Sequence, residues 1–177
     1  MSRRARVIAV ALGALALGAT GRAGAEATRY EGPFFSFAVP DGATAKPGSD
    51  VSADAAVVVT RGDGTITATV LAGSRRVPEG ELESTASEWR GARVKNRAAW
   101  GMKANGGPPR ESVRIGERKW MRWRDRIGSV LGAQEQTMTC GGLNGHLACV
   151  VVSAPAKERE AADALAAALL STLKIRR

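Results

Sequence analysis

Residues 140–149 read CGGLNGHLAC and hold both cysteines and the only histidine of the chain. Asn-Gly is the strongest short signal for a two-residue β-turn, because both central residues of a type I′ turn need positive φ. A turn at Asn144-Gly145 places Cys140 directly opposite Cys149 on the neighbouring strand. The cysteines then form a non-hydrogen-bonded pair with Cα atoms about 4.5 Å apart, a separation that suits a disulfide. The stretch therefore predicts a β-hairpin closed by a disulfide.

A metal site and a redox pair are the two competing interpretations of this stretch. In the predicted register His146 shares a face with Leu143, whereas Cys140 and Cys149 point to the other face. The chain has no further cysteine or histidine to complete a zinc site. A redox pair usually has two residues between its cysteines at a helix start, and this pair has eight. We therefore expect no metal ligands and a structural disulfide.

The N-terminus has the pattern of a secretory signal peptide. Three arginines precede an apolar run at 7–19, and the small residues Ala-Gly-Ala follow at 23–25; the arginines are Arg3, Arg4 and Arg6. The run is shorter than the ~20 residues that span a bilayer. Because the third arginine displaces the apolar residues that a twin-arginine signal requires, general secretion is the better prediction. Residues 1–25 are therefore assigned as a signal peptide of a periplasmic or secreted protein.

Cleavage between Ala25 and Glu26 leaves a mature chain of 152 residues. That length suits one globular domain, assigned to 26–177, and no transmembrane segment is expected after cleavage. An oxidising compartment also agrees with the predicted disulfide.

Hydrophobic periodicity and turn residues predict the order of the other elements. Short strands come first, followed by a helix with acidic residues in its first turn and basic ones in its last, then a Gly- and Pro-rich loop. A late antiparallel meander and an Ala- and Leu-rich helix that begins after Pro155 complete the chain. The predicted ranges are strands at 34–39, 55–60, 65–71, 133–139 and 147–152, a helix at 79–94 and a loop at 99–110.

This order resembles the PsbP-like fold. The resemblance rests on FFSFAVPDG at 34–42, the middle helix, the late meander, and the terminal helix that ends in STLKI at 171–175. It implies an α+β fold in which an antiparallel sheet is packed between helices as an α/β/α sandwich. Proteins with this fold include an extrinsic photosystem II subunit, a Ran-binding nuclear import factor and bacterial envelope proteins. They resemble one another in fold while acting mostly as binding or assembly modules, and they supply no catalytic motif.

Positive charge is concentrated between residues 89 and 126, where twelve lysines and arginines face three acids. The densest piece, KWMRWRDR at 119–126, alternates as a strand does. One face carries the predicted anion- or partner-binding residues Trp120, Arg122, Arg124 and Arg126, and the opposite face is expected to be core. Arginine forks and an indole can bind anions. The competing interpretation is a solvated outer sheet face with arginine stems covering the tryptophan.

Two functional classes agree with these observations. The first is a non-enzymatic envelope module that binds a protein partner or an anionic envelope surface; the compartment disfavours nucleic acid. The second is a small envelope hydrolase or inhibitor with a site in the sheet–helix cleft that uses Glu117, Asp125 or His146. The chain lacks the common catalytic and phosphate-binding motifs. The first class is therefore preferred, with no catalytic residues and no cofactor expected.

The signal peptide leads to a direct test. Expression of the full chain in a secreting bacterium should yield an exported protein whose N-terminal residue is Glu26, because the small residues before it form the cleavage pattern. N-terminal sequencing and intact mass measure this. An exported protein that retains residues 1–25 would contradict the assignment.

Overall fold

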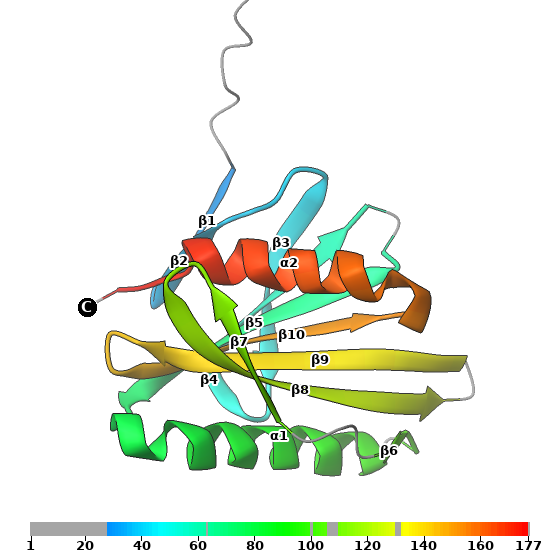
Figure 1. The fold of residues 1–177 in the computed structure, drawn as a ribbon. Coiled ribbons are helices and arrows are strands. Elements are labelled where there is room, and N and C mark those ends of the chain that lie inside the picture. The colour runs from blue at the N-terminus through cyan, green and yellow to red at the C-terminus, as the bar shows by residue number, and fades with distance from the viewer. Residues whose placement is uncertain (1–27, 63, 100, 106–109, 130–131, 177) are drawn as a thin grey trace, which may run out of the picture.

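The computed structural model describes residues 28–62, 64–99, 101–105, 110–129 and 132–176. An eight-stranded antiparallel sheet lies between helix α1 and helix α2, which cover opposite faces (Figure 1). This is the predicted α+β class. The predicted signal peptide and its cleavage site lie outside the described residues, as does Trp100 of the predicted loop at 99–110. None of the described helices is long and apolar enough to span a membrane.

The main sheet has the strand order β3-β4-β5-β10-β9-β8-β6, and β7 pairs with β8. Its strands are β3 (Ala43–Asp50), β4 (Ala53–Arg61), β5 (Ile66–Arg76), β6 (Lys103–Asn105), β7 (Glu111–Ile115), β8 (Arg118–Ser129), β9 (Gly132–Leu143) and β10 (His146–Ala154). A small sheet contains β1 (Arg29–Glu31), β2 (Phe35–Ala38) and β11 (Lys174–Ile175). The helices are α1 (Leu82–Ala99) and α2 (Arg159–Thr172), preceded by the 3₁₀ turns η1 (Glu79–Glu81) and η2 (Ala156–Glu158).

The predicted disulfide hairpin is confirmed at the centre of this sheet. Asn144 and Gly145 both have positive φ, 53° and 80°, and they connect β9 to β10. Cys140 pairs with Cys149 in the expected register, with Cα atoms 4.1 Å apart, and the two form a disulfide. Both cysteines are fully buried beneath α1. The bond therefore joins the two central strands inside the core.

Each face of the sheet has its own hydrophobic core. On the α2 side, alternate residues of β5 and β10 pack against leucines of α2 and against Phe35 and Phe37 of the small sheet. On the α1 side, Leu147, Cys149 and Val151 of β10 pack with residues of β5 and β9. Because β10 is apolar on both faces, it must be a central strand. The prediction for 147–152 is therefore confirmed.

Two glycines of the hairpin make room for large side chains on opposite faces. A Cβ atom on Gly141 would lie 2.7 Å from the Trp120 ring, and one on Gly142 would lie 2.9 Å from a methyl group of Leu82. Any larger residue would overlap these groups. The Gly-Gly pair thus seats Trp120 under α2 and Leu82, the first residue of α1, on the other face.

Arginines as well as apolar contacts attach α1 to the sheet. Arg90 forms a bidentate pair with Asp125 of β8, and Arg93 pairs with Asp50 at the end of β3. Burial lowers the pKa of Arg93 to about 10, and the nearby charge of Arg97 adds to the effect. Arg90 and Arg93 therefore attach α1 to β8 and β3, which lie on opposite sides of the centre of the sheet.

No strand range was predicted for β1, β3, β6, β7 or β11, and β3 and β6 show why. β3 at 43–50 contains Pro47 and Gly48, which conceal a strand pattern. β3 is an edge strand, where such residues are tolerated. β6 at 103–105 lies inside the predicted loop and pairs with the end of β8. Because β6 has only three residues, no periodicity could reveal it.

Adding a methyl group at residue 141 tests the close contact between Gly141 and Trp120. Gly141→Ala should destabilise the protein by about 1–3 kcal/mol through overpacking. Gly91→Ala is the control, because nothing lies within 4 Å of its added Cβ and alanine favours the helix; it should stabilise by about 0.5–1 kcal/mol. Urea unfolding measures both. Equal changes in the free energy of unfolding at the two sites would contradict the packing. In a Trp120→Leu background, Gly141→Ala should lower the free energy of unfolding less, because the ring is absent.

Candidate binding surface

The predicted binding face of β8 lies against α2 instead of solvent. Trp120 is only 2% exposed and belongs to the α2-side core, together with Leu143 and Leu170. The expectation of an exposed tryptophan was therefore wrong. Alternation along the strand correctly separated the two faces, since Trp123 and Ile127 are buried on the other side. Both faces of β8 are covered, one by each helix.

Arg122 and Arg124 bind acidic groups between β8 and α2. The Arg124 guanidinium donates hydrogen bonds to both oxygens of Asp163 on α2, at 3.2 and 2.8 Å, and to the Thr137 hydroxyl at 3.2 Å. Arg122 Nη1 reaches the same carboxylate at 3.3 Å. The side chains of Arg122 and Arg124 are only 11% and 16% exposed. These two cations are therefore already neutralised within the protein.

Glu135 of β9 extends this ionic cluster to a third arginine. Arg159 at the start of α2 forms a bidentate pair with Glu135, which also lies 3.5 Å from Arg124 Nη1. The hydrogen bonds from Arg159 lower the pKa of Glu135, while those to Asp163 raise the pKa of Arg124. With Glu111 of β7 near Arg124, three acids balance three arginines.

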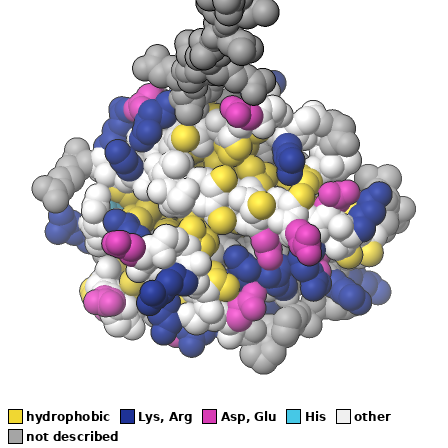
Figure 2. Space-filling model, turned by 45° about the horizontal axis from the view of Figure 1, so that its top comes forward, with side chains coloured by type: hydrophobic (Ala, Val, Ile, Leu, Met, Phe, Trp, Pro, Cys, Tyr) yellow, Lys and Arg dark blue, Asp and Glu magenta, His cyan; other side chains and the backbone are white. Residues whose placement is uncertain are grey.

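Arg126 is the one exposed member of the predicted face. Figure 2 turns the α2 side toward the viewer, and its dark blue side chains stand beside magenta ones around a largely yellow centre. This mixture of charges shows that the positive charge concentrated in 89–126 does not form a uniformly basic surface on this side of the molecule.

The residues considered for hydrolysis lie apart. Glu117 occupies the turn before β8, whereas Asp125 is eight residues further along and paired with Arg90; that spacing is about 26 Å along a strand. His146 begins β10, with Nδ1 3.1 Å from the carbonyl oxygen of Gly73 and its ring against Phe34. These three residues do not converge on one site.

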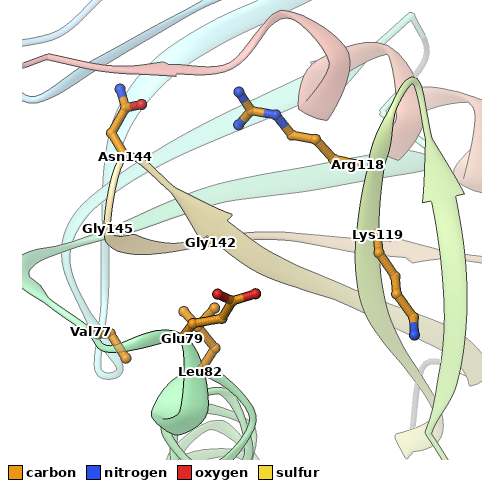
Figure 3. Close-up of a pocket in the computed structure, with 8 residues that line it drawn as sticks. All are labelled: Val77, Glu79, Leu82, Arg118, Lys119, Gly142, Asn144 and Gly145. Atoms are coloured by element: carbon orange, nitrogen blue, oxygen red, sulfur yellow. The ribbon is translucent and has the colours of Figure 1, made fainter.

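A hollow of about 540 Å³ opens at the end of the sheet, between η1, the β9–β10 turn and the start of β8 (Figure 3). Its described lining consists of Val77, Glu79, Leu82, Arg118, Lys119, Gly142, Asn144 and Gly145. Figure 3 shows Arg118 and Lys119 extending from β8 in opposite directions, with Glu79 directed into the space between the elements. The hollow therefore combines an apolar floor with charges of both signs.

Arg118 and Lys119 are both exposed, and neither forms an ion pair with any described residue. They differ in this from Arg122 and Arg124 of the same strand. Gly116, with φ of 58°, makes the tight turn from β7 that exposes them. The sequence did not single out Arg118 and Lys119 as unpaired. Their position directly after the β7–β8 turn was the available signal, because a helix packed on a sheet does not cover the strand ends next to a turn.

Comparison with known proteins identifies the fold. No protein-family model and no curated protein matches the chain in sequence. Among solved structures, the PsbP protein of the cyanobacterium Synechocystis is similar, with a TM-score of 0.60, 16% identity, and coverage of 90% of this chain and 99% of that one. A Bacteroides thetaiotaomicron protein is similar with a TM-score of 0.54 and 12% identity, over 84% of this chain and 48% of its own. The fold is PsbP-like, as predicted.

A third similar structure is Mycobacterium tuberculosis LpqN, described as involved in cell envelope biogenesis. Its TM-score is 0.47 at 12% identity, with 88% of each chain covered.

The Glu135–Arg159 pair leads to a pH-dependent prediction. A carboxylate whose pKa is lowered by folding stabilises the native state above its unfolded pKa, and that contribution is lost as pH falls through the folded pKa. Wild type should therefore exceed Glu135→Gln in stability most at pH 7, and the difference should close between about pH 5 and pH 2. Urea unfolding across this range measures it, with the exposed Glu117→Gln as control. A difference that does not vary with pH would contradict the assignment.

Proposed function

We propose that the protein is a non-enzymatic, secreted or periplasmic binding module that holds a segment of a protein partner in the hollow at the end of the sheet. The observation that carries this proposal is that Arg118 and Lys119, beside that hollow, form no ion pair within the part of the chain that the structure describes. Arg122 and Arg124 of the same strand are instead bound within the protein. Because Arg118 and Lys119 extend from β8 in opposite directions, each can receive a separate acidic group of a partner segment whose apolar residues lie on the floor of the hollow.

The charges around the hollow favour a protein partner over an anionic membrane surface. Glu79 lies among the lining residues and Glu117 lies at the adjacent turn, so acids are interspersed with the cations. An anionic bilayer attracts clusters of cations and would be repelled by these carboxylates. A polypeptide carries both charges and can pair with Glu79 as well as with Arg118. The volume of the hollow is within the range of known ligand sites.

The localisation part of the proposal depends on the signal-peptide pattern and on the disulfide. A buried disulfide in the central hairpin persists in an oxidising compartment. The PsbP-like fold agrees with a binding role but does not determine one, because folds host many functions.

Photo-crosslinking in the producing cells tests the proposal. A benzophenone amino acid at Glu79, inside the hollow, should give a discrete adduct with one protein. Arg118→Ser/Lys119→Ser should reduce that adduct about tenfold or more, since charge-assisted contacts are lost. Lys46→Ser/Arg61→Ser removes the same charge and should leave the adduct unchanged, because Arg61 pairs with Ile66 at the far end of β5.

Two results would overturn this function. One is an adduct of equal yield in both double variants. The other is salt-sensitive binding of the purified mature protein to phosphatidylglycerol vesicles, lost in Arg118→Ser/Lys119→Ser, with no protein adduct. That result would assign the same cations to an anionic surface.

A further inference from the structure

A second pocket, of about 300 Å³, lies on the α2 side of the same strand end. It separates the β7–β8 hairpin from the last turn of α2. Its apolar lining consists of Ile115, Trp120, Leu143, Leu170 and Leu173. All five belong to the α2-side core or pack against it. The pocket is therefore an opening into a hydrophobic core, with walls held by the surrounding elements.

Two cations stand beside this apolar space. Arg118 and Lys174 both line the pocket, and neither is ion-paired with a described residue. They come from opposite walls, because Arg118 begins β8 and Lys174 follows α2 in β11. Ser171, also in the lining, already donates its hydroxyl hydrogen to the Ala168 carbonyl oxygen at 2.9 Å. The lysine and the arginine are therefore the pocket's available donors, and they oppose the single acid Glu117.

We propose that this pocket binds a small amphipathic carboxylate, with the apolar chain against Trp120 and the leucines and the carboxylate between Arg118 and Lys174. An apolar wall with few convergent polar groups is typical of small-molecule sites. The volume equals that of about ten water molecules, which matches a ligand with about ten non-hydrogen atoms. Octanoate has that size. A neutral ligand of the same length would leave both cations without a partner.

Trp120 supplies a direct reporter for occupancy. Its indole nitrogen is buried and donates to no acceptor among the described residues. A ligand chain against the indole ring changes the magnetic environment of its N–H. The Trp120 indole resonance, assigned through Trp120→Phe, therefore reports on this pocket separately from the hollow at Lys119.

The test is a titration of ¹⁵N-labelled, disulfide-intact mature protein with sodium octanoate, followed at the Trp120 indole resonance. Octan-1-ol is the tail-only control and acetate the headgroup-only control. We expect a saturable octanoate-dependent shift and much weaker effects of both controls. Lys174→Ser should raise the dissociation constant for octanoate about tenfold. Arg61→Ser, which removes an exposed cation elsewhere, should change it less than twofold.

Three outcomes would overturn the inference. The first is octanol binding as tight as that of octanoate, which would show that the cations take no part. The second is an equal effect of Lys174→Ser and Arg61→Ser on the dissociation constant for octanoate, which would show that only the net charge of the protein matters. The third is the absence of a shift of the Trp120 indole resonance when the folded protein is exposed to millimolar octanoate. None of these changes the crosslinking result, because Lys174 and Trp120 do not line the hollow.

Discussion

Arg124 on β8 donates two hydrogen bonds to Asp163 on α2, and this contact lets an apolar helix pack over a basic strand. An arginine that is only 16% exposed would be costly without a carboxylate partner. Asp163 supplies that partner to Arg122 as well, and Glu135 joins through Arg159. The acids of α2 and β9 thereby allow Arg122 and Arg124 to lie between β8 and α2 inside the sandwich.

The same chemistry operates on the other face of the sheet. Asp125 of β8 binds Arg90 of α1, so one strand contributes charges to both layers. Apolar contacts through Leu82 and Trp89 attach the first half of α1 to the sheet, and ion pairs attach the second half. Much of the positive charge of the chain therefore serves packing. The cations at the end of the sheet, Arg118 and Lys119, lie beyond the cover of either helix and are available to a partner.

Local chemistry explains which predictions succeeded. The Asn144-Gly145 turn fixes the hairpin register within ten residues, so the Cys140–Cys149 pairing could be derived without the rest of the fold. Alternation along β8 likewise separated its faces. It could not show that α2 covers the face with Trp120, because Asp163 lies 39 residues beyond Arg124 in the sequence. For the same reason, the sequence alone did not distinguish the paired arginines from the free Arg118.

The cations of β8 fall into two groups. Arg122 and Arg124 are bound within the protein, whereas Arg118, Lys119 and Arg126 are exposed and form no ion pair with a described residue. Timed modification of the folded protein with phenylglyoxal, read out residue by residue by mass spectrometry, tests this division most directly. Arg118 should react at least about tenfold faster than Arg122 and Arg124, since the latter are largely buried and hydrogen-bonded to Asp163. Asp163→Asn should accelerate the modification of Arg124. Equal reaction rates at the three arginines in the wild-type protein would contradict the account.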